Sequence, residues 1–568
     1  MTSSNTQQQS RYGSVLAITL LLAVIAGSLG TLIWGFDKGF LLSDGGFTLL
    51  RYQDIQPTDT RSWILDHLIV KALVPSSLRT ILGLRYLGFV LNLFSSTIFG
   101  LAIYKASKSI FRKNNLRLDL LVLMMLAGFV LSYSFLPSEL SYLSLGQFFI
   151  NISAAMILVS IKSKKIPAIS AVCISAVCCS LLVLTRFPSG IALSVIGFVY
   201  LIIMNRRELA GVFLVTFLVL VVMLWFHFNL DYNWFVHNVR GMLENPDKNH
   251  FQVRAIRQVE MIGILFGAFL AAVLVSYSLH VFHKEGVSKA RRLVALVVSI
   301  FVLTVWLSYS AIQPFFGSYI KSDFLIAPSL LIVTTHFYKK KILSLSILFD
   351  IIRKNRETVV TSLLLFCIPY IGYLGSWGSM NLYSKYNSIS HLGLVFLLLP
   401  YCRLAKRNIL AYVYALLLVI AGSWSYVMNP MGSTPLFKQT HEFRGIRYEP
   451  EMAMQLKFIS QILRDSGFRN EQGIIAPLTP GIVYLMDSFS PGGVVWSDRY
   501  LEDYLDILRT TELQQNPLVI IYSPGALAGF TEGFKEATGL DINEDYDLIS
   551  KASDNIGVVQ IYFPKIKG

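Results

Sequence analysis

Trp34-Gly-Phe-Asp37-Lys-Gly-Phe-Leu-Leu-Ser-Asp44-Gly-Gly-Phe-Thr48 is the stretch that directly follows the first hydrophobic span of the chain. It places two carboxylates, Asp37 and Asp44, among apolar and aromatic residues at the mouth of a membrane-embedded segment. The glycines between them let the backbone approach a ligand closely. A carboxylate that is partly shielded from water at a membrane face is a candidate general base. The alternative is a polar turn that only ends the span.

The composition is that of a membrane protein. The chain has 568 residues, of which 54% are hydrophobic and only 15% are charged. Apolar runs long enough to cross a bilayer recur along it. The net charge of +15 raises the alternative of nucleic-acid binding. The basic residues, however, stand in short clusters between the spans, as in the cytoplasmic loops of membrane proteins. We therefore predict a multi-pass protein of the cell (inner) membrane with no nucleic-acid partner.

The distribution of basic residues also predicts the topology. Nearly every inner connection is basic, and every long connection is outer, which gives about 13 transmembrane helices with the N-terminus in the cytoplasm. Two outer loops are long, 36–77 after the first span and 229–258 after the seventh. Within the first loop, residues 60–73 have apolar side chains at helical spacing with charges between them. This pattern predicts an amphipathic helix on the membrane surface.

The composition changes from about Asn429 onward. A helical pattern there has Pro450 at its start and Gly467 after its end, the usual positions of these two residues. Short apolar runs follow, with helical patterns between several of them, and they predict strands of a small α/β domain. The runs are Gly473–Pro477, Ile482–Met486, Val494–Trp496, Leu518–Tyr522 and Val558–Phe563. We predict a mainly α protein with a transmembrane domain over 1–428 and an extracytoplasmic α/β domain over 429–568.

Polar residues gather on the outer side, while the mid-span positions are almost free of ionisable groups, so we expect the chemistry at the outer membrane face. Glu139 lies in the short turn 136–140. It would orient an acceptor, hold a metal or raise the pKa of a neighbouring acid, or alternatively cap the next helix. Arg186 stands before a Pro turn, where its fork of donors suits a phosphate. The alternative for Arg186 is an interfacial side chain that reaches to the headgroups.

Several outer basic residues run against the charge rule and therefore need an anionic partner. Anionic lipid headgroups are one such partner, and a lipid-phosphate substrate is the other. These residues are Arg254, Arg257, Lys321 and Lys385. The sequence contains no Walker loop, dinucleotide fingerprint or zinc-ligand spacing. We predict no cofactor and a reaction that is either independent of metal or weakly dependent on a divalent metal.

Taken together, these features resemble the GT-C superfamily of membrane glycosyltransferases, which includes protein O-mannosyltransferases, lipid A aminoarabinose transferases and oligosaccharyltransferases. Its bacterial members often read Asp-Glu-Gly-Tyr-Tyr where this chain reads Asp44-Gly-Gly-Phe-Thr48. They often read Pro-Ser-Tyr-Asn where this chain reads Pro137-Ser-Glu-Leu140. A basic residue before a Pro turn is similar to Arg186-Phe-Pro188. The resemblance covers about residues 13–427 and, more loosely, the C-terminal domain.

The resemblance implies a GT-C-like fold and a polyprenyl-phosphate-linked sugar as the donor. The acceptor would be a lipid, a glycan or a protein on the extracytoplasmic side. Asp44 would deprotonate the acceptor hydroxyl, while Arg186 and Lys321 would hold the leaving phosphate. Arg254 and Arg257 are further candidates for binding the lipid phosphate.

One position departs from the family pattern. The Glu that follows the Asp in the family is Gly45 in this chain. Either Glu139 or Asp37 would then supply the second acid, which makes both of them candidate catalytic residues beside Asp44.

Three other functions are alternatives. A polysaccharide ligase or polymerase would depend on Arg and His in the outer loop 229–258 and would not need acids in the first loop. A flippase or transporter of lipid-linked sugars would need a polar central cavity, which the scarcity of ionisable mid-span residues disfavours. A scaffolding membrane protein would leave the acids scattered rather than lining one cavity.

Overall fold

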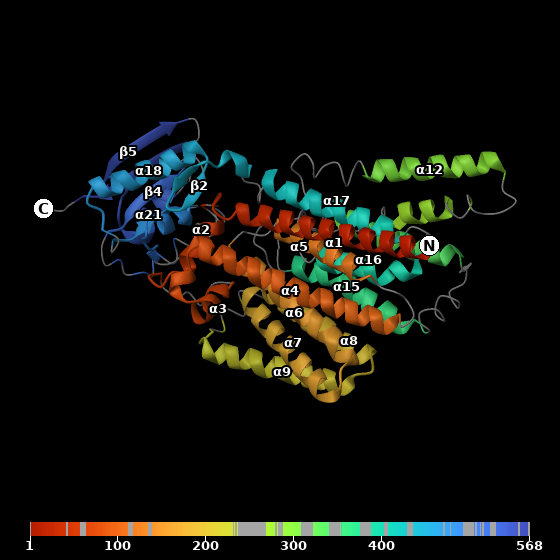
Figure 1. The fold of residues 1–568 in the computed structure, drawn as a ribbon. Coiled ribbons are helices and arrows are strands. Elements are labelled where there is room, and N and C mark those ends of the chain that lie inside the picture. The colour runs from red at the N-terminus through yellow and green to blue at the C-terminus, as the bar shows by residue number, and fades with distance from the viewer. Residues whose placement is uncertain are drawn as a thin grey trace. The chain divides into compact units, whose positions relative to one another are not determined.

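The structure is a computed structural model, and helices predominate in it (Figure 1). The residues that it describes are 2–40, 42, 44–56, 64–111, 117–134, 139–230, 232, 236, 269–278, 281, 288–307, 322–339, 353, 355–374, 388–402, 407–428, 435–469, 472–477, 479–491, 505, 508–509, 511, 513, 516–522, 530–554 and 557–565.

The chain forms two compact units. The first consists of Met1–Trp34 and Gly88–Met431, and the second of Gly35–Leu87 and Gly432–Gly568. The loop that carries Asp37 and Asp44 therefore shares a compact unit with the C-terminal part of the chain, although nearly 350 residues separate them in the sequence.

Long apolar helices build the first unit. Five helices of the described chain are long and apolar enough to cross a membrane, namely Ile81–Ile110 (α4, which begins in the second unit), Tyr142–Lys162 (α6), Lys165–Thr185 (α7), Arg207–His227 (α9) and Arg407–Met428 (α17). In its described part this unit also contains α1 (Thr2–Trp34), α5 (Leu118–Tyr133), α8 (Phe187–Ile203), the apolar helix Phe269–Ser278, α12 (Lys289–Leu307), α13 (Ser322–Lys339), α15 (Arg356–Leu374), α16 (Ser388–Leu398) and the 3-10 turn η5 (Leu399–Tyr401).

The centre of the first unit is α5, which is buried from Leu120 to Tyr133 almost without interruption. It packs against both α16 and α17. A Cβ atom at Gly128 would lie 2.7 Å from the Ile389 Cα atom, so the absence of a side chain lets α5 and α16 approach closely. The Ser388 N–H also donates to Ser132 Oγ at 3.1 Å.

Helices and a small sheet build the second unit. The first-loop segment contributes α2 (Asp44–Tyr52), α3 (Asp66–Leu73) and the 3-10 turn η1 (Ser76–Leu78). The C-terminal segment contributes the 3-10 turn η7 (Leu436–Lys438), β1 (His441–Phe443), β2 (Ile446–Tyr448), α18 (Pro450–Asp465), β3 (Ile474–Ile475), α19 (Pro480–Leu485), β4 (Leu518–Tyr522), α21 (Phe530–Thr538), β5 (Tyr546–Asp554) and β6 (Gly557–Pro564).

The four-stranded sheet of this unit has the order β3-β4-β6-β5. Its β3 and β4 strands are parallel, with Ile474 opposite Leu518, and the other two pairs are antiparallel. β1 and β2 form a separate antiparallel hairpin. Beside the sheet lies a buried apolar cluster of Ile475, Leu505, Leu508, Val519, Phe530, Phe534, Ile542 and Tyr546.

Two local predictions need correction. The apolar run Ile482–Met486 is not a strand, because residues 480–485 form the helix α19 with Pro480 in its first turn. The helix expected over 60–73 is seen as α3 from Asp66, and residues 57–63 lie outside the described ranges. Its residues Asp66–Val70 are buried within the unit rather than on a membrane surface, since α3 packs against α2.

Candidate active site

Asp44 is the first residue of α2, in the loop that follows the first span. Residues 45–52 of this helix are all buried, and Arg51 in the last turn is its only basic residue. The positive end of a helix dipole lies at the N-terminus, where it stabilises a negative charge. The N-terminal end of α2, which is the backbone position of Asp44, is therefore the end of the helix that favours an anion.

Buried polar side chains meet at the other end of α2. Arg51 forms an ion pair with Asp66, with 3.5 Å between Nη1 and Oδ1. Its Nη2 atom also contacts the Ile64 carbonyl oxygen and His67 Nδ1. Tyr52 donates its hydroxyl hydrogen to Asp66 Oδ2. Burial raises the pKa of Tyr52 well above its usual value, and the neighbouring carboxylate adds to the effect. This cluster joins the end of α2 to the start of α3.

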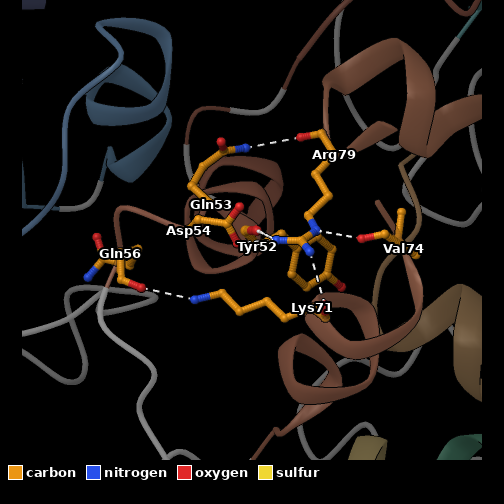
Figure 2. A network of polar contacts seen from close by, with 7 residues as sticks. All are labelled: Tyr52, Gln53, Asp54, Gln56, Lys71, Val74 and Arg79. Atoms are coloured by element: carbon orange, nitrogen blue, oxygen red, sulfur yellow. Dashed lines mark hydrogen bonds and ion pairs between the residues drawn. The ribbon is translucent and has the colours of Figure 1, made fainter. Parts of the chain in front are cut away.

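Figure 2 shows a second polar network, which is built around Arg79. The guanidinium of Arg79 forms an ion pair with Asp54. It also donates to three main-chain carbonyl oxygens, those of Val74 (2.8 Å), Lys71 (3.0 Å) and Tyr52 (3.3 Å). One side chain therefore ties the end of α2 to the end of α3.

Two further hydrogen bonds complete this network (Figure 2). Lys71 Nζ donates to the Gln56 carbonyl oxygen at 2.9 Å. Gln53 Nε2 donates to the Arg79 carbonyl oxygen at 3.0 Å. Burial lowers the pKa of Lys71, and the Asp54 carboxylate opposes that shift. The loop that follows α2 is thus held by charged side chains, with backbone carbonyls as their main acceptors.

Asp37 has its own partners in the second unit. Its carboxylate forms an ion pair with Arg447 (Oδ2–Nε 3.0 Å) and another with Lys38 (3.5 Å). Burial lowers the pKa of Lys38, and Asp37 opposes the shift. The backbone around Asp37 is also fixed, because Arg85 donates to the carbonyl oxygens of Phe36 (2.5 Å), Lys38 (3.0 Å) and Gly39. These contacts place Asp37 in an ion-pair network that joins the loop to Arg447 of β2.

Glu139 belongs to the first unit and is buried, with 5% of its surface exposed. Its carbonyl oxygen accepts a hydrogen bond from Ser144 Oγ at 3.5 Å. The N-cap of α6 is Ser141, which forms a capping box with Ser144. The side chain of Glu139 is thus not the one that caps this helix.

Arg186 lies in the same unit and is 3% exposed. It is the single residue between α7 and α8, and its backbone is not helical (φ −154°, ψ 80°). Because Pro188 stands in the first turn of α8, the chain reverses at Arg186 and begins a new helix at once. A Cβ atom at Gly146 of α6 would lie 2.9 Å from Arg186 Cδ. The Arg186 side chain therefore lies against α6, near its first turns.

The predicted site residues thus fall into three groups. Glu139 and Arg186 both lie near the N-terminal end of α6 in the first unit. Asp37 and Asp44 belong to the second unit. The remaining predicted phosphate-binding residues, Lys321, Arg254 and Arg257, lie outside the described ranges, as does Lys385 and most of the loop 229–258.

The sequence did not single out the side chains that hold the first loop together. They are Arg51, Asp66, His67, Arg79 and Arg85, all of them at least 90% buried. The available signal was the presence of charged residues inside apolar helical patterns, where an unpaired charge would be costly. Among the residues that the structure describes, no group of three or more His, Cys, Asp or Glu is placed to hold a metal ion.

No protein-family model matches the chain, and no curated protein matches it. Solved structures do. One is the Archaeoglobus fulgidus oligosaccharyltransferase in complex with Zn and sulfate, at 11% identity and a TM-score of 0.43, covering 94% of this chain and 72% of that one. Another is the archaeal oligosaccharyltransferase AglB from the same organism, in complex with an inhibitory peptide and a dolichol-phosphate, at 10% identity and 0.42, covering 96% and 74%.

A third similar structure is ArnT from Cupriavidus metallidurans in the apo state. It has 13% identity and a TM-score of 0.35, and the match covers 97% of this chain and 98% of that one. These neighbours are glycosyltransferases of the GT-C type.

Proposed function

We propose that this chain is an integral membrane glycosyltransferase of the GT-C type. It transfers a sugar from a polyprenyl-phosphate-linked donor to a lipid, glycan or protein acceptor on the extracytoplasmic face. The observation that carries the proposal is the position of Asp44. It begins a buried helix directly after the first span, in a loop that charged side chains hold in place. The motif around Asp44 is also one of the three that resemble the family.

The proposed architecture follows the sequence. About 13 transmembrane helices form a domain over 1–428, with the N-terminus in the cytoplasm. Residues 429–568 form an α/β domain on the extracytoplasmic side. The described part of the chain supports this with its five helices that are long and apolar enough to cross a membrane, and with the mixed sheet near the C-terminus.

In the proposed reaction, Asp44 accepts the proton of the acceptor hydroxyl. The acceptor oxygen forms a bond to the anomeric carbon of the sugar from the face opposite the phosphate. The bond between that carbon and the phosphate oxygen breaks, and the polyprenyl phosphate leaves with the bonding electrons. Transfer would therefore invert the anomeric centre. A base in a fixed position lowers the barrier because less orientational freedom is lost on the way to the transition state.

Arg186 is the proposed partner of the leaving phosphate. Its guanidinium carries a permanent positive charge and parallel donors that match phosphate oxygens. A buried position strengthens its interaction with the charge that develops on the phosphate. Lys321, Arg254 and Arg257 have the same proposed role. Either Glu139 or Asp37 is the proposed second acid in place of the family's Glu.

The substitution Asp44→Asn tests the proposal. The amide keeps the size of the side chain but cannot take the proton, so we expect loss of the transferred sugar with an unchanged amount of folded protein. The readout is mass spectrometry of envelope glycans in cells that carry the variant as their only copy. Asp487→Asn, at an exposed acid of the second unit, is the matched control and should leave the product unchanged. A fully active Asp44→Asn variant would refute the proposal.

A further inference from the structure

Two glycines face each other where the Asp44 helix meets the C-terminal segment of the second unit. A Cβ atom at Gly46 of α2 would lie 2.1 Å from the backbone nitrogen of Gly481 in α19, and 2.3 Å from its Cα atom. A Cβ atom at Gly481 would lie 2.7 Å from the Leu42 Cα atom. Neither glycine has a positive φ angle. The need for glycine therefore comes from the close approach of the two backbones and not from an unusual conformation.

A hydrogen bond fixes the register of this contact. The Gly481 N–H donates to the Leu42 carbonyl oxygen at 2.7 Å. Gly481 lies in the first turn of α19, where backbone N–H groups have no acceptor within their own helix. The loop carbonyl two residues before Asp44 supplies that acceptor. The start of α19 and the start of α2 are thus joined backbone to backbone, which leaves little freedom for sliding.

Further hydrogen bonds join the first loop to the C-terminal segment both before and after α2 in the sequence. After the helix, the Gln56 side chain bonds the Ser490 backbone twice, with Nε2 donating to the carbonyl oxygen at 3.1 Å and Oε1 accepting from the N–H at 2.9 Å. Before the helix, the Arg447 carbonyl oxygen accepts a hydrogen bond from the Gly39 N–H at 2.8 Å. The backbone N–H of Arg447 donates to the Asp37 carbonyl oxygen at 2.6 Å. Asp37 and Arg447 also form their ion pair there.

We propose that the C-terminal segment holds α2 in position through contacts at Arg447, Gly481 and Ser490, which we call the seat of α2. Gly46 and Gly481 are then positioning residues for the proposed base, Asp44. This inference rests on the proposed function of Asp44, and it assigns a task to the terminal segment. The three anchors lie at 37–39, 42–46 and 56, so they bracket α2 along the chain. The helix is too short to be stable alone. Its place therefore depends on what the C-terminal segment offers it.

Hydrogen exchange followed by mass spectrometry on the full-length protein in detergent tests the seat without any substrate. In Gly46→Ala and in Gly481→Ala, the new methyl group meets backbone atoms, so the two segments have to separate. We expect amides of α2 to exchange about tenfold faster or more, as in local opening, while amides of α6 and α7 keep their rates. Gly211→Ala is the matched control, because a Cβ atom there meets nothing within 4 Å.

A milder variant covers the case in which a glycine substitution prevents folding. Gln56→Leu keeps the volume of the side chain and removes both bonds to Ser490. It should also accelerate exchange in α2, by a smaller factor. If a glycine variant folds and its α2 amides exchange at the unchanged rate, the proposed seat is refuted. If neither glycine variant folds, an unchanged exchange rate of the α2 amides in Gln56→Leu refutes it.

Turnover separates a positioning role from general stability. With lipid-linked donor extracted from the same membranes and diluted in series, we expect Gly481→Ala to lower kcat about a hundredfold and to leave KM for the donor nearly unchanged. Faster exchange in α2 with full kcat would mean that the seat does not position the base. Asp44→Asn should keep slow exchange in α2. If Asp44→Asn is active, the proposed function is refuted. The proposal that the C-terminal segment holds α2 in place is then still decided by the exchange rates of the glycine variants.

Discussion

Arg51 and Asp66 form an ion pair that is almost completely removed from solvent, with 6% and 2% of their side chains exposed. Arg51 approaches one carboxylate oxygen, and the hydroxyl of Tyr52 donates to the other. Both oxygens of the acid therefore have a partner on α2. A pair of this kind adds little net stability when intact, because both ions lose their hydration, but the loss of one partner leaves a buried charge uncompensated.

Arg51→Met should therefore destabilise the second unit strongly. The expected loss is about 3–5 kcal/mol, because Asp66 remains buried without its cation. Thermal unfolding of the detergent-solubilised protein measures the change. Arg444→Met is the matched control, since Arg444 pairs with Asp487 at a site where 38% and 72% of the two side chains are exposed. An exposed pair contributes only about 0–1 kcal/mol. Equal effects of the two substitutions would contradict the argument.

Tyr52 predicts a loss of stability at alkaline pH. Burial and the Asp66 carboxylate raise its pKa in the folded state above the unfolded value of about 10. The folded state therefore keeps the hydroxyl proton at a pH where the unfolded state has released it. The stabilising contribution is complete below about pH 10 and declines as the pH rises further, by about 1 kcal/mol at pH 11.

Tyr52→Phe isolates that contribution. At pH 8 the variant should be less stable by about 1.5–3 kcal/mol, because a hydrogen bond to a charged acceptor is lost. Toward pH 11 the difference from the unchanged protein should narrow, since only the latter loses the contribution of Tyr52. Unfolding curves at the two pH values provide the comparison. A difference that stays constant with pH would show that Tyr52 does not keep its proton in the folded state.

The sequence predicted what depends on local pattern. The apolar runs of α4 and α7 are visible because a membrane helix needs a long continuous apolar segment. The helix α18 is visible because Pro450 and Gly467 mark its ends. The run Ile482–Met486 was misread, because a short apolar run has no period that distinguishes a buried strand from a buried helix. Only Pro480, just before the run, pointed to a helix.

The contacts that hold the candidate site were beyond local pattern. Arg51 and Asp66 are 15 residues apart, and Gln56 and Ser490 are separated by 434 residues. The first pair depends on how α2 packs against α3, and the second depends on how the first loop packs with the C-terminal segment. The same holds for Gly46 and Gly481, whose common role is visible only once the two backbones lie together. A charged residue or a glycine in an apolar segment indicates that it has a partner or a close neighbour. It does not indicate which residue that is.

In the proposed reaction, Arg186→Met should lower kcat/KM for transfer, because the leaving phosphate would lose a fixed positive charge. Removal of one such donor typically costs about 10²–10³-fold. Arg186→Lys keeps the charge but loses the planar fork, so its activity should fall between that of Met and that of Arg. Arg206→Met is the control, since Arg206 donates to the Ile161 carbonyl oxygen and has no proposed role in transfer. Equal activity of the Lys and Met variants would show that the positive charge of Arg186 does not contribute to transfer.

Gly190→Ala should disturb the helix pair that presents Arg186. A Cβ atom at Gly190 would lie 2.6 Å from the Val183 backbone nitrogen and 2.8 Å from its Cα atom, so α7 and α8 would have to move apart. Such overpacking costs about 1–3 kcal/mol. Because Arg186 is the only residue between these two helices, its guanidinium should also shift, and transfer should fall together with the melting temperature.

Gly211→Ala gives the opposite expectation on a neighbouring helix. No atom would lie within 4 Å of its new Cβ atom, and alanine favours a helix over glycine by about 1 kcal/mol. The melting temperature should therefore stay or rise, with unchanged transfer. If Gly190→Ala behaved in the same way, the contact between α7 and α8 would have to be looser than 2.6 Å implies. The position of Arg186 would then depend on its contact with Gly146 of α6. Gly146→Ala would be the substitution that tests this contact.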